Sequence, residues 1–165
     1  MRKEGVTIKD LLNTLPQVGI VSWISIRPER RSMPVEKESV LADASHGLEG
    51  DHYGGGAGGK RQVTLISEEH LHAVASFLGK EKLDPALVRR NIVVRGINLL
   101  ALKDQQFQIG EAVLETTGLC HPCSRMEENL GEGGYNAMRG HGGITAKIIK
   151  SGRIKVGDKV KLINP

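Results

Sequence analysis

The feature that most constrains this fold is a series of short apolar segments separated by glycine-rich turns. Segments of four to ten residues rich in Val, Ile and Leu, bounded by turn residues, are typical of strands. The glycines cluster at the corners and form no repeat. We therefore expect a mainly β, α+β fold: a partly closed β-barrel of short strands with a few peripheral helices. The expected strands are 18–27, 38–42, 61–66, 92–95, 106–109, 112–117, 144–149 and 153–160.

Chain length and composition predict one domain with an aliphatic core. At 165 residues the chain has the length of a single domain, which we assign to residues 1–165. Hydrophobic residues make up 39% of the chain but aromatic residues only 3%, so aliphatic side chains must fill the interior. Residues 1–17 include an amphipathic helix over 7–15 that Pro16 ends, and we expect this segment to dock on one end of the fold.

Net charge and cysteine content limit the kinds of ligand and the cellular compartment that we expect for this chain. The net charge of +4 is too mild and dispersed to indicate nucleic-acid binding, but it favours an anionic ligand. No apolar run has the length of a membrane span and nothing resembles a signal peptide, so we expect a cytoplasmic protein with no membrane association. In that compartment, two cysteines predict no disulfide framework.

The densest chemistry lies in segment 117–125, which contains both cysteines. Here Cys120, His121, Cys123 and Arg125 follow a strand and a glycine turn. We expect Cys123 near the N-terminus of a short helix, where the helix dipole and Arg125 would lower its pKa and favour a thiolate. The alternatives are buried apolar thiols, a redox dithiol or a zinc site, but a closed zinc site needs four ligands and this segment offers at most three. A single reactive thiolate, that of Cys123, is the preferred interpretation.

Two further polar stretches precede apolar strands. The first, residues 46–52, carries His46 and Asp51 and leads through a glycine-rich loop, a candidate lid, to Arg61. Its alternative is a polar turn whose aspartate caps backbone N–H groups. The second stretch either holds an anion by bidentate hydrogen bonds or forms a solvated loop. It consists of Arg89, Arg90 and Asn91.

Two other segments complete the set of polar loops. His141 lies between glycines, next to Gly142, and we expect it to be exposed to whatever docks there. The arginine pair Arg30–Arg31 lies in a proline-bounded loop, and we expect it to be solvated surface. Because a barrel brings its loops to a common rim, the polar stretches predict a pocket for a phosphate-bearing ligand with a soft metal or an electrophilic sulfur.

Four ordered motifs resemble the MOSC family, domains similar to the C-terminal part of molybdenum-cofactor sulfurases, and the likeness covers roughly residues 18–163. They are Gly-Leu-Glu-Gly-Asp-His at 47–52, Arg-Arg-Asn-Ile at 89–92, the Cys-x-x-Cys at 120–123, and the closing Gly-Gly-Ile-Thr-Ala-Lys with Gly-Asp-Lys-Val. The resemblance implies a β-barrel-like fold and a pocket for molybdopterin, the pterin-based molybdenum cofactor. It also implies that Cys123 is a sulfur carrier or a thiolate ligand to molybdenum.

The resemblance further implies which side chains meet the cofactor. Arginines and Asn91 would hold the pterin phosphate and ring edge. The full set of expected cofactor-binding residues is His46, Asp51, Arg61, Arg89, Arg90, Asn91, Arg125, His141 and Gly142. We expect no pyridoxal phosphate, because the chain has no room for the desulfurase domain of the long sulfurases. The N-terminal β-rich segment of the amidoxime-reducing relatives is also not expected here. Cofactor contacts that those relatives make through this segment therefore cannot be assigned to residues of this chain.

Three functions remain open. The first is a small molybdoenzyme that reduces N-hydroxylated compounds, with Cys123 on molybdenum and electrons from an external donor protein. The second is a sulfur carrier that receives a persulfide on Cys123 from an external sulfur-donor protein and needs no metal. The third is a module that stores the cofactor without chemistry. We rank them in this order.

Overall fold

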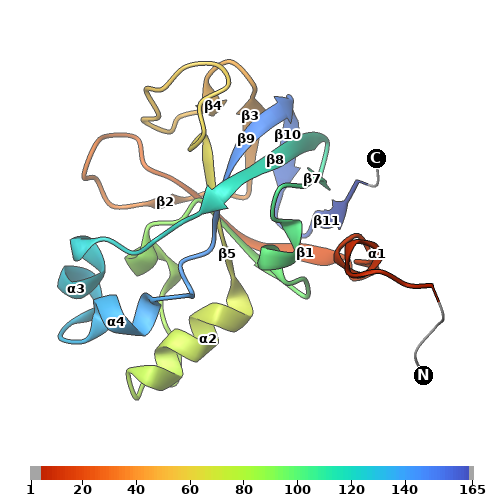
Figure 1. Ribbon diagram of the computed structural model, residues 1–165. Coiled ribbons are helices and arrows are strands. Elements are labelled where there is room, and N and C mark those ends of the chain that lie inside the picture. The colour runs from red at the N-terminus through yellow and green to blue at the C-terminus, as the bar shows by residue number, and fades with distance from the viewer. Residues whose placement is uncertain (1–4, 164–165) are drawn as a thin grey trace.

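The computed structural model describes residues 5–163 and confirms a mainly β fold built on a barrel (Figure 1). The barrel strands are β1 Gly19–Ile26, β5 Val63–Ser67, β6 Ile92–Arg95, β7 Gln106–Ile109, β8 Ala112–Leu119, β9 Ile144–Lys150 and β11 Lys159–Leu162. They are hydrogen-bonded in the order β11, β7, β8, β9, β5, β6, β1. β1 also pairs with β11, so the barrel that we expected to be partly closed closes fully.

One parallel pair determines where the helices lie. β5 and β6 are parallel, whereas the other barrel pairs are antiparallel. A parallel pair needs a crossover, and α2 Glu68–Phe77 and the 3-10 helix η1 Pro85–Val88 supply it. Ser67 caps the N-terminus of α2, where its side chain accepts from the His70 N–H. The crossover therefore places the start of β6 beside helices at one end of the barrel.

Smaller elements surround this frame. A three-stranded sheet runs in the order β10, β3, β4, and a further short strand, β2, extends the barrel sheet from β1. Their bounds are β2 Val35–Glu36, β3 Ser39–Asp43, β4 Gly47–Leu48 and β10 Gly152–Lys155. The remaining helices are α1 Ile8–Leu12, η2 Leu99–Leu102, α3 Ser124–Leu130 and α4 Gly134–Met138. None of the helices described here has the length and apolar character needed to cross a membrane.

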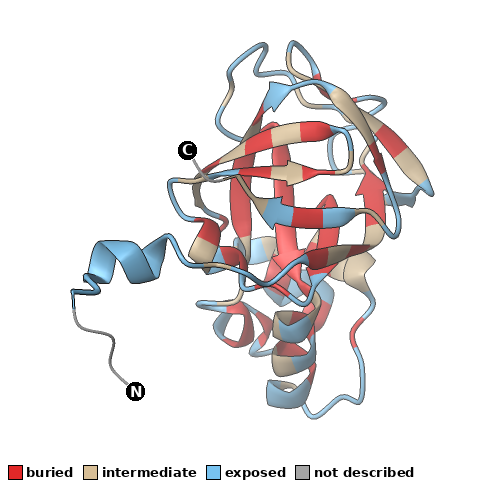
Figure 2. Ribbon diagram, turned by 90° about the vertical axis from the view of Figure 1, so that its right-hand side faces the viewer, coloured by how far each residue is buried: buried red, intermediate tan, exposed pale blue. Residues whose placement is uncertain are grey.

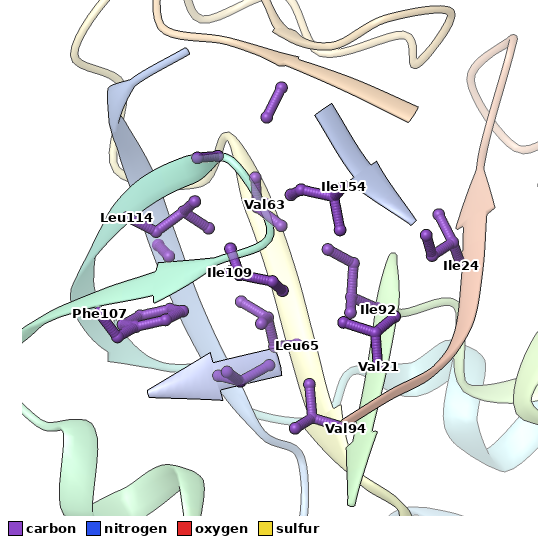
Figure 3. Close-up of a cluster of buried hydrophobic side chains, with 14 of the residues drawn as sticks. Val21, Ile24, Val63, Leu65, Ile92, Val94, Phe107, Ile109, Leu114 and Ile154 are labelled. Atoms are coloured by element: carbon purple, nitrogen blue, oxygen red, sulfur yellow. The ribbon is translucent and has the colours of Figure 1, made fainter. Parts of the chain in front are cut away.

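The core is aliphatic, as composition predicts, and has two parts. The larger part fills the barrel, where side chains such as Val21, Leu65, Ile92 and Ile109 point into the interior around Phe107 (Figure 3). The smaller part lies under α2, α3 and α4 outside the barrel (Figure 2). Burial of this apolar area stabilises the fold by roughly 25 cal/mol per Å². The second part fixes α3, and with it the cysteine segment, against the barrel.

The expected docking of the N-terminal helix is not seen. Thr7 caps α1 with a capping box, but the helix has no buried residue, and its apolar side chains at Ile8, Leu11 and Leu12 are exposed. Figure 2 shows the helix projecting from the barrel. The contacts of the segment come after the helix: Asn13 accepts a hydrogen bond from Gln105 over 2.9 Å, and Leu15 packs against the barrel core. Residues 1–4 of the predicted segment lie outside the described range.

Candidate functional site

The cysteine segment leaves the barrel at the end of β8 and enters α3. Cys120 is buried, with 2% of its surface exposed, and its N–H donates to the Gly143 carbonyl over 2.8 Å. Cys123 is the N-cap residue of α3, with extended backbone, and is exposed. The predicted place of Cys123 at a helix N-terminus is confirmed. Both thiols are free, but they differ in access to solvent, so Cys123 is the one that can meet a ligand.

Arg90 connects the cysteine segment to the barrel from a buried position. Its guanidinium donates to three carbonyls: Nε to Gly142 (2.8 Å), Nη1 to Val88 (2.9 Å) and Nη2 to Cys120 (3.3 Å). Burial lowers the pKa of Arg90, and the nearby thiols of Cys120 and Cys123 oppose this shift. Because most of its donors are used on backbone, Arg90 positions the segment more than it offers a binding surface.

Gly142 contributes through its backbone. The residue is buried, and its carbonyl accepts the Arg90 bond. A Cβ atom at this position would overlap the carbonyl oxygen of Cys120. The loop that follows α4 can therefore lie against the cysteine segment only because residue 142 has no side chain.

Asn91 lies inside the barrel wall, with 2% of its surface exposed. Its Oδ1 accepts from the N–H (3.0 Å) and the hydroxyl (3.1 Å) of Thr64, and its Nδ2 donates to the Ser25 carbonyl (3.3 Å). These partners belong to β5 and β1. The side chain therefore fixes the start of β6 between its two neighbouring strands and does not point into a cleft.

Arg89 connects the barrel rim to the loop between β1 and β2. Its backbone is left-handed (φ 60°, ψ 27°), and its Nη1 donates to the Ser32 carbonyl over 2.9 Å. Burial lowers the pKa of Arg89, and the like charges of Arg27 and Arg125 lower it further. The loop, the rim and the start of α3 thus meet through Arg89 and its neighbours.

These segments enclose an open cleft of about 440 Å³, a volume typical of small-molecule sites. In Figure 1 the orange loop that leads to β2 and the cyan helix α3 mark its two sides. We call it the arginine cleft. Its lining is Arg27, Arg30, Arg31, His52, Arg61, Arg89, Arg90, His121, Cys123, Ser124, Arg125 and Met126.

The charge of the arginine cleft is one-sided. Seven lining residues are arginines and none is Asp or Glu. The carboxylate of Asp51 is buried behind Arg27: it accepts the Arg27 backbone N–H over 2.7 Å and lies 3.9 Å from Nε. Arg61 directs Nη2 towards the Cys120 sulfur, 3.8 Å away. Such a cleft attracts anions and stabilises negative charge on the ligand that it binds.

The structure brings half of the predicted site residues together. Those that line the arginine cleft are Cys123, Arg61, Arg89, Arg90 and Arg125. Asn91 and Gly142 lie behind it as described. His46 and Asp51 line a neighbouring cleft of about 550 Å³ together with Asp43, Glu49 and Tyr53.

His141 lies away from the arginine cleft, on the side of α2. Its ring packs edge-on against His70, with centroids 4.9 Å apart, and near Phe77 at 5.5 Å. Burial lowers the pKa of His70, and His141 adds to this shift. The expectation that His141 is exposed is therefore wrong, because α2 covers one side of its ring.

Sequence reasoning missed three of the arginines and one histidine. Arg27, Arg30, Arg31 and His52 line the cleft, whereas the sequence predicts solvated surface for the pair Arg30–Arg31. The two residues are exposed, but the Arg89–Ser32 hydrogen bond holds their loop over the rim. No local pattern in the sequence predicts that bond, since its partners are 57 positions apart.

The chain offers one soft ligand and many anion donors. Among residues 5–163, no three His, Cys, Asp or Glu side chains gather closely enough to hold a metal ion. Cys123 would therefore be a single protein ligand to a group that carries its own metal. The buried Nε of Arg27 has no hydrogen-bond partner in this part of the chain, so it adds an unfilled donor. These features fit an anionic group that presents a soft centre to the thiolate.

Comparisons with known proteins agree with this architecture. The family model for the MOSC domain matches residues 49–161. The YuaD protein from Bacillus subtilis superposes with a TM-score of 0.75 at 20% identity, covering 89% of this chain and 97% of that one. YiiM from Geobacillus stearothermophilus gives 0.69 at 14% identity, covering 88% and 75% of the two chains. YiiM from Escherichia coli gives 0.64 at 18%, covering 88% and 70%. No curated protein matches the sequence significantly.

Proposed function

Because this chain belongs to the MOSC domain family, we propose that its arginine cleft binds the molybdenum cofactor and that Cys123 supplies a thiolate ligand to the molybdenum. One observation carries the proposal: an exposed thiol in a cleft of seven arginines with no carboxylate in its lining. Molybdopterin carries a phosphate and a soft metal centre, and this set of side chains suits both.

The role of each side chain in binding the cofactor would depend on whether its hydrogen-bond donors are already used within the protein. Arg61, Arg89 and Arg125 line the cleft and keep donors free for the phosphate and the pterin edge. Arg90 and Asn91 would act as positioning residues, because their polar groups hold backbone and barrel. When bound, the molybdenum would supply the redox chemistry.

We infer that the protein reduces N-hydroxylated compounds in the cytoplasm. The open cleft lets a small substrate approach Cys123, and His52 and His121 are titratable groups in its lining that could deliver protons. The N–OH group would take up electrons and protons and leave as N–H and water. No cluster of metal-ligating side chains in the described residues could store those electrons, so an external donor protein would supply them.

The proposal is tested by metal analysis of protein purified from a molybdate-fed, cofactor-competent host. We expect near-stoichiometric molybdenum in the wild type and a loss of at least ~10-fold in Cys123→Ser, because the ligand is removed. Ser124→Ala is the matched control: Ser124 is the exposed next residue in the same lining and should retain the metal. A wild type without molybdenum, or a Cys123→Ser variant that retains it, would contradict the proposal.

The second candidate is a sulfur carrier, and the exposure of Cys123 without companion metal ligands favours it. The cleft arginines would stabilise a persulfide anion as readily as a thiolate. In this case the same preparation gains the mass of one sulfur atom on Cys123 and contains no molybdenum. Turnover of an amidoxime with a reduced dye separates the enzyme from a module that only stores the cofactor.

A further inference from the structure

The arginines of the cleft fall into two groups by their partners. Arg27, Arg61, Arg89 and Arg90 contact a carboxylate, a sulfur or carbonyl groups of the protein. The side chains of Arg30, Arg31 and Arg125 donate no hydrogen bond within residues 5–163. Arg125 is already assigned to the cofactor, so the guanidinium groups of Arg30 and Arg31 remain available for another anion.

The cleft carries more positive charge than one cofactor phosphate offsets. A phosphate monoester adds about −1.5 to −2 at neutral pH. Asp51 accompanies Arg27, and a Cys123 thiolate would add one further negative charge. Several of the seven arginines still lack a counter-charge. Since like charges in one cleft repel, a second anionic group would lower the energy of the bound state.

The backbone gives an independent reason to single out this loop. Only three non-glycine residues between 5 and 163 have a positive φ: Arg31 (66°), Arg89 (60°) and Asp104 (56°). The left-handed conformation is unfavourable for a residue with a Cβ atom, and glycine would adopt it without that strain. Two of the three are arginines of the same cleft, so guanidinium groups occupy positions where the backbone favours glycine.

The turn that presents Arg30 and Arg31 is internally held. The Ser32 hydroxyl donates to the Glu29 carbonyl (2.7 Å) and accepts the Glu29 N–H (3.2 Å). The Ser32 carbonyl in turn accepts from Arg89. The two adjacent guanidinium groups therefore leave a turn whose backbone is already held at the edge of the cleft, so binding has to order only their side chains.

We propose that the substrate carries its own anionic group, a phosphate or a carboxylate, and that Arg30 and Arg31 bind it beside the cofactor. The inference rests on the proposed function and names its substrate class: N-hydroxylated compounds that bear an anion. A second phosphate on a nucleotide-extended cofactor would present the same chemistry from another source. The test therefore separates the two.

The first measurement needs no cofactor. In cofactor-free protein at low salt, the rates at which iodoacetate and iodoacetamide alkylate Cys123 are compared by peptide mapping. The two reagents differ in charge, so the ratio of their rates reports the local potential. We expect Arg30→Gln/Arg31→Gln to lower the iodoacetate-to-iodoacetamide ratio by about fivefold. The control Arg95→Gln/Arg139→Gln removes the same charge outside the cleft lining and should stay within about twofold.

The second measurement uses the loaded protein. A neutral amidoxime is compared with the same amidoxime carrying a carboxylate or a phosphate. In Arg30→Gln/Arg31→Gln we expect the KM of the anionic substrate to rise about tenfold relative to that of the neutral one, with molybdenum and nucleotide content as in the wild type. The control variant should match the wild type in both values.

Three other outcomes overturn the inference. An unchanged alkylation ratio excludes an anion site at these arginines, and equal effects on both substrates exclude recognition of the substrate anion. Loss of molybdenum or of a bound nucleotide from Arg30→Gln/Arg31→Gln assigns the arginines to the cofactor. Absence of molybdenum from the wild type contradicts the proposed function alone, and the alkylation ratio then decides whether the anion site exists.

Discussion

Two clefts share the segment between β4 and β5 and have opposite charge. The arginine cleft takes His52 from this segment, whereas the neighbouring acidic cleft takes Asp51 and Tyr53 on either side of it. The acidic cleft has no Arg or Lys in its lining and three carboxylates, those of Asp43, Glu49 and Asp51. The two volumes are similar, about 440 and 550 Å³, so size does not distinguish the clefts.

The clefts differ in how they are built. Behind the arginine cleft lie buried polar groups, Arg90 and Asn91, and a glycine that lets two loops touch. In the acidic cleft the carboxylates of Asp43 and Glu49 lie on a partly exposed turn, where Asp43 accepts from the Ser45 N–H and the His46 ring, and only the Asp51 carboxylate is buried. A site held by buried polar bonds has fixed geometry, and altering it costs stability. Substitutions should therefore lower the free energy of unfolding more in the arginine cleft than in the acidic cleft.

The largest effect is expected for Arg90→Met. Three carbonyl groups lose their charged donor, and the cysteine segment loses its link to the barrel. We expect the free energy of unfolding to fall by about 3 kcal/mol, measured by urea denaturation. Cys120, which is buried in the wild type, should also become accessible to alkylation in the folded variant.

Arg125→Met is the matched control for this change. It removes one arginine from the same lining, but its side chain makes no hydrogen bond to the described residues. Its free energy of unfolding should change by less than about 0.5 kcal/mol. If Arg90→Met were as stable as this control and kept Cys120 protected from alkylation, the hydrogen bonds of Arg90 would not be what holds the cysteine segment against the barrel.

A smaller loss is expected for Gly142→Ala. The added methyl group would overlap the Cys120 carbonyl, and because that atom is backbone the loop must move. We expect a loss of about 2 kcal/mol in the free energy of unfolding. In the acidic cleft Gly54 is the counterpart, since a Cβ there meets nothing within 4 Å, and Gly54→Ala should be nearly neutral. Equal stability of the two variants would contradict the claim that the arginine cleft is more sensitive to substitution than the acidic cleft.

The fold was largely predictable, because hydrophobic segments and turn glycines constrain a barrel strongly. Each predicted strand overlaps an observed one, and α1 lies within the helix predicted over 7–15. Full closure was not predictable, since the β1–β11 pairing joins strands from opposite ends of the chain. The exposed α1 was not predictable either, because an apolar stripe gives no information about whether a partner surface lies within reach.

The site was predictable only where residue type alone decides the chemistry. Cys123 and the arginines near strand starts follow from chemistry and turn position. Asn91 and His141 could not be placed, because the same polar side chain can bind a ligand or satisfy buried backbone. The orientation of each is set by contacts distant in sequence: Asn91 with Ser25 and His141 with His70.

The smallest effect is expected for Asp43→Asn in the acidic cleft. The Ser45 N–H and the His46 ring hold the pKa of Asp43 below its ordinary value near 3.8. The folded state therefore favours the carboxylate more than the unfolded state does. This contribution to stability is complete above the unfolded pKa and is lost as the pH falls through the folded value.

The change in Tm between pH 7 and pH 3 should therefore be slightly smaller in Asp43→Asn than in the wild type, as thermal denaturation would show. Glu49→Gln is the control in the same lining, since no hydrogen bond to its carboxylate is found in residues 5–163. Across this pH range the guanidinium groups of the arginine cleft keep their charge. At pH 7 the iodoacetate preference of Cys123 should be the same in Asp43→Asn as in the wild type, because Asp43 lies in the lining of the other cleft. A preference that followed the Asp43 substitution would show that the two clefts act as one electrostatic unit.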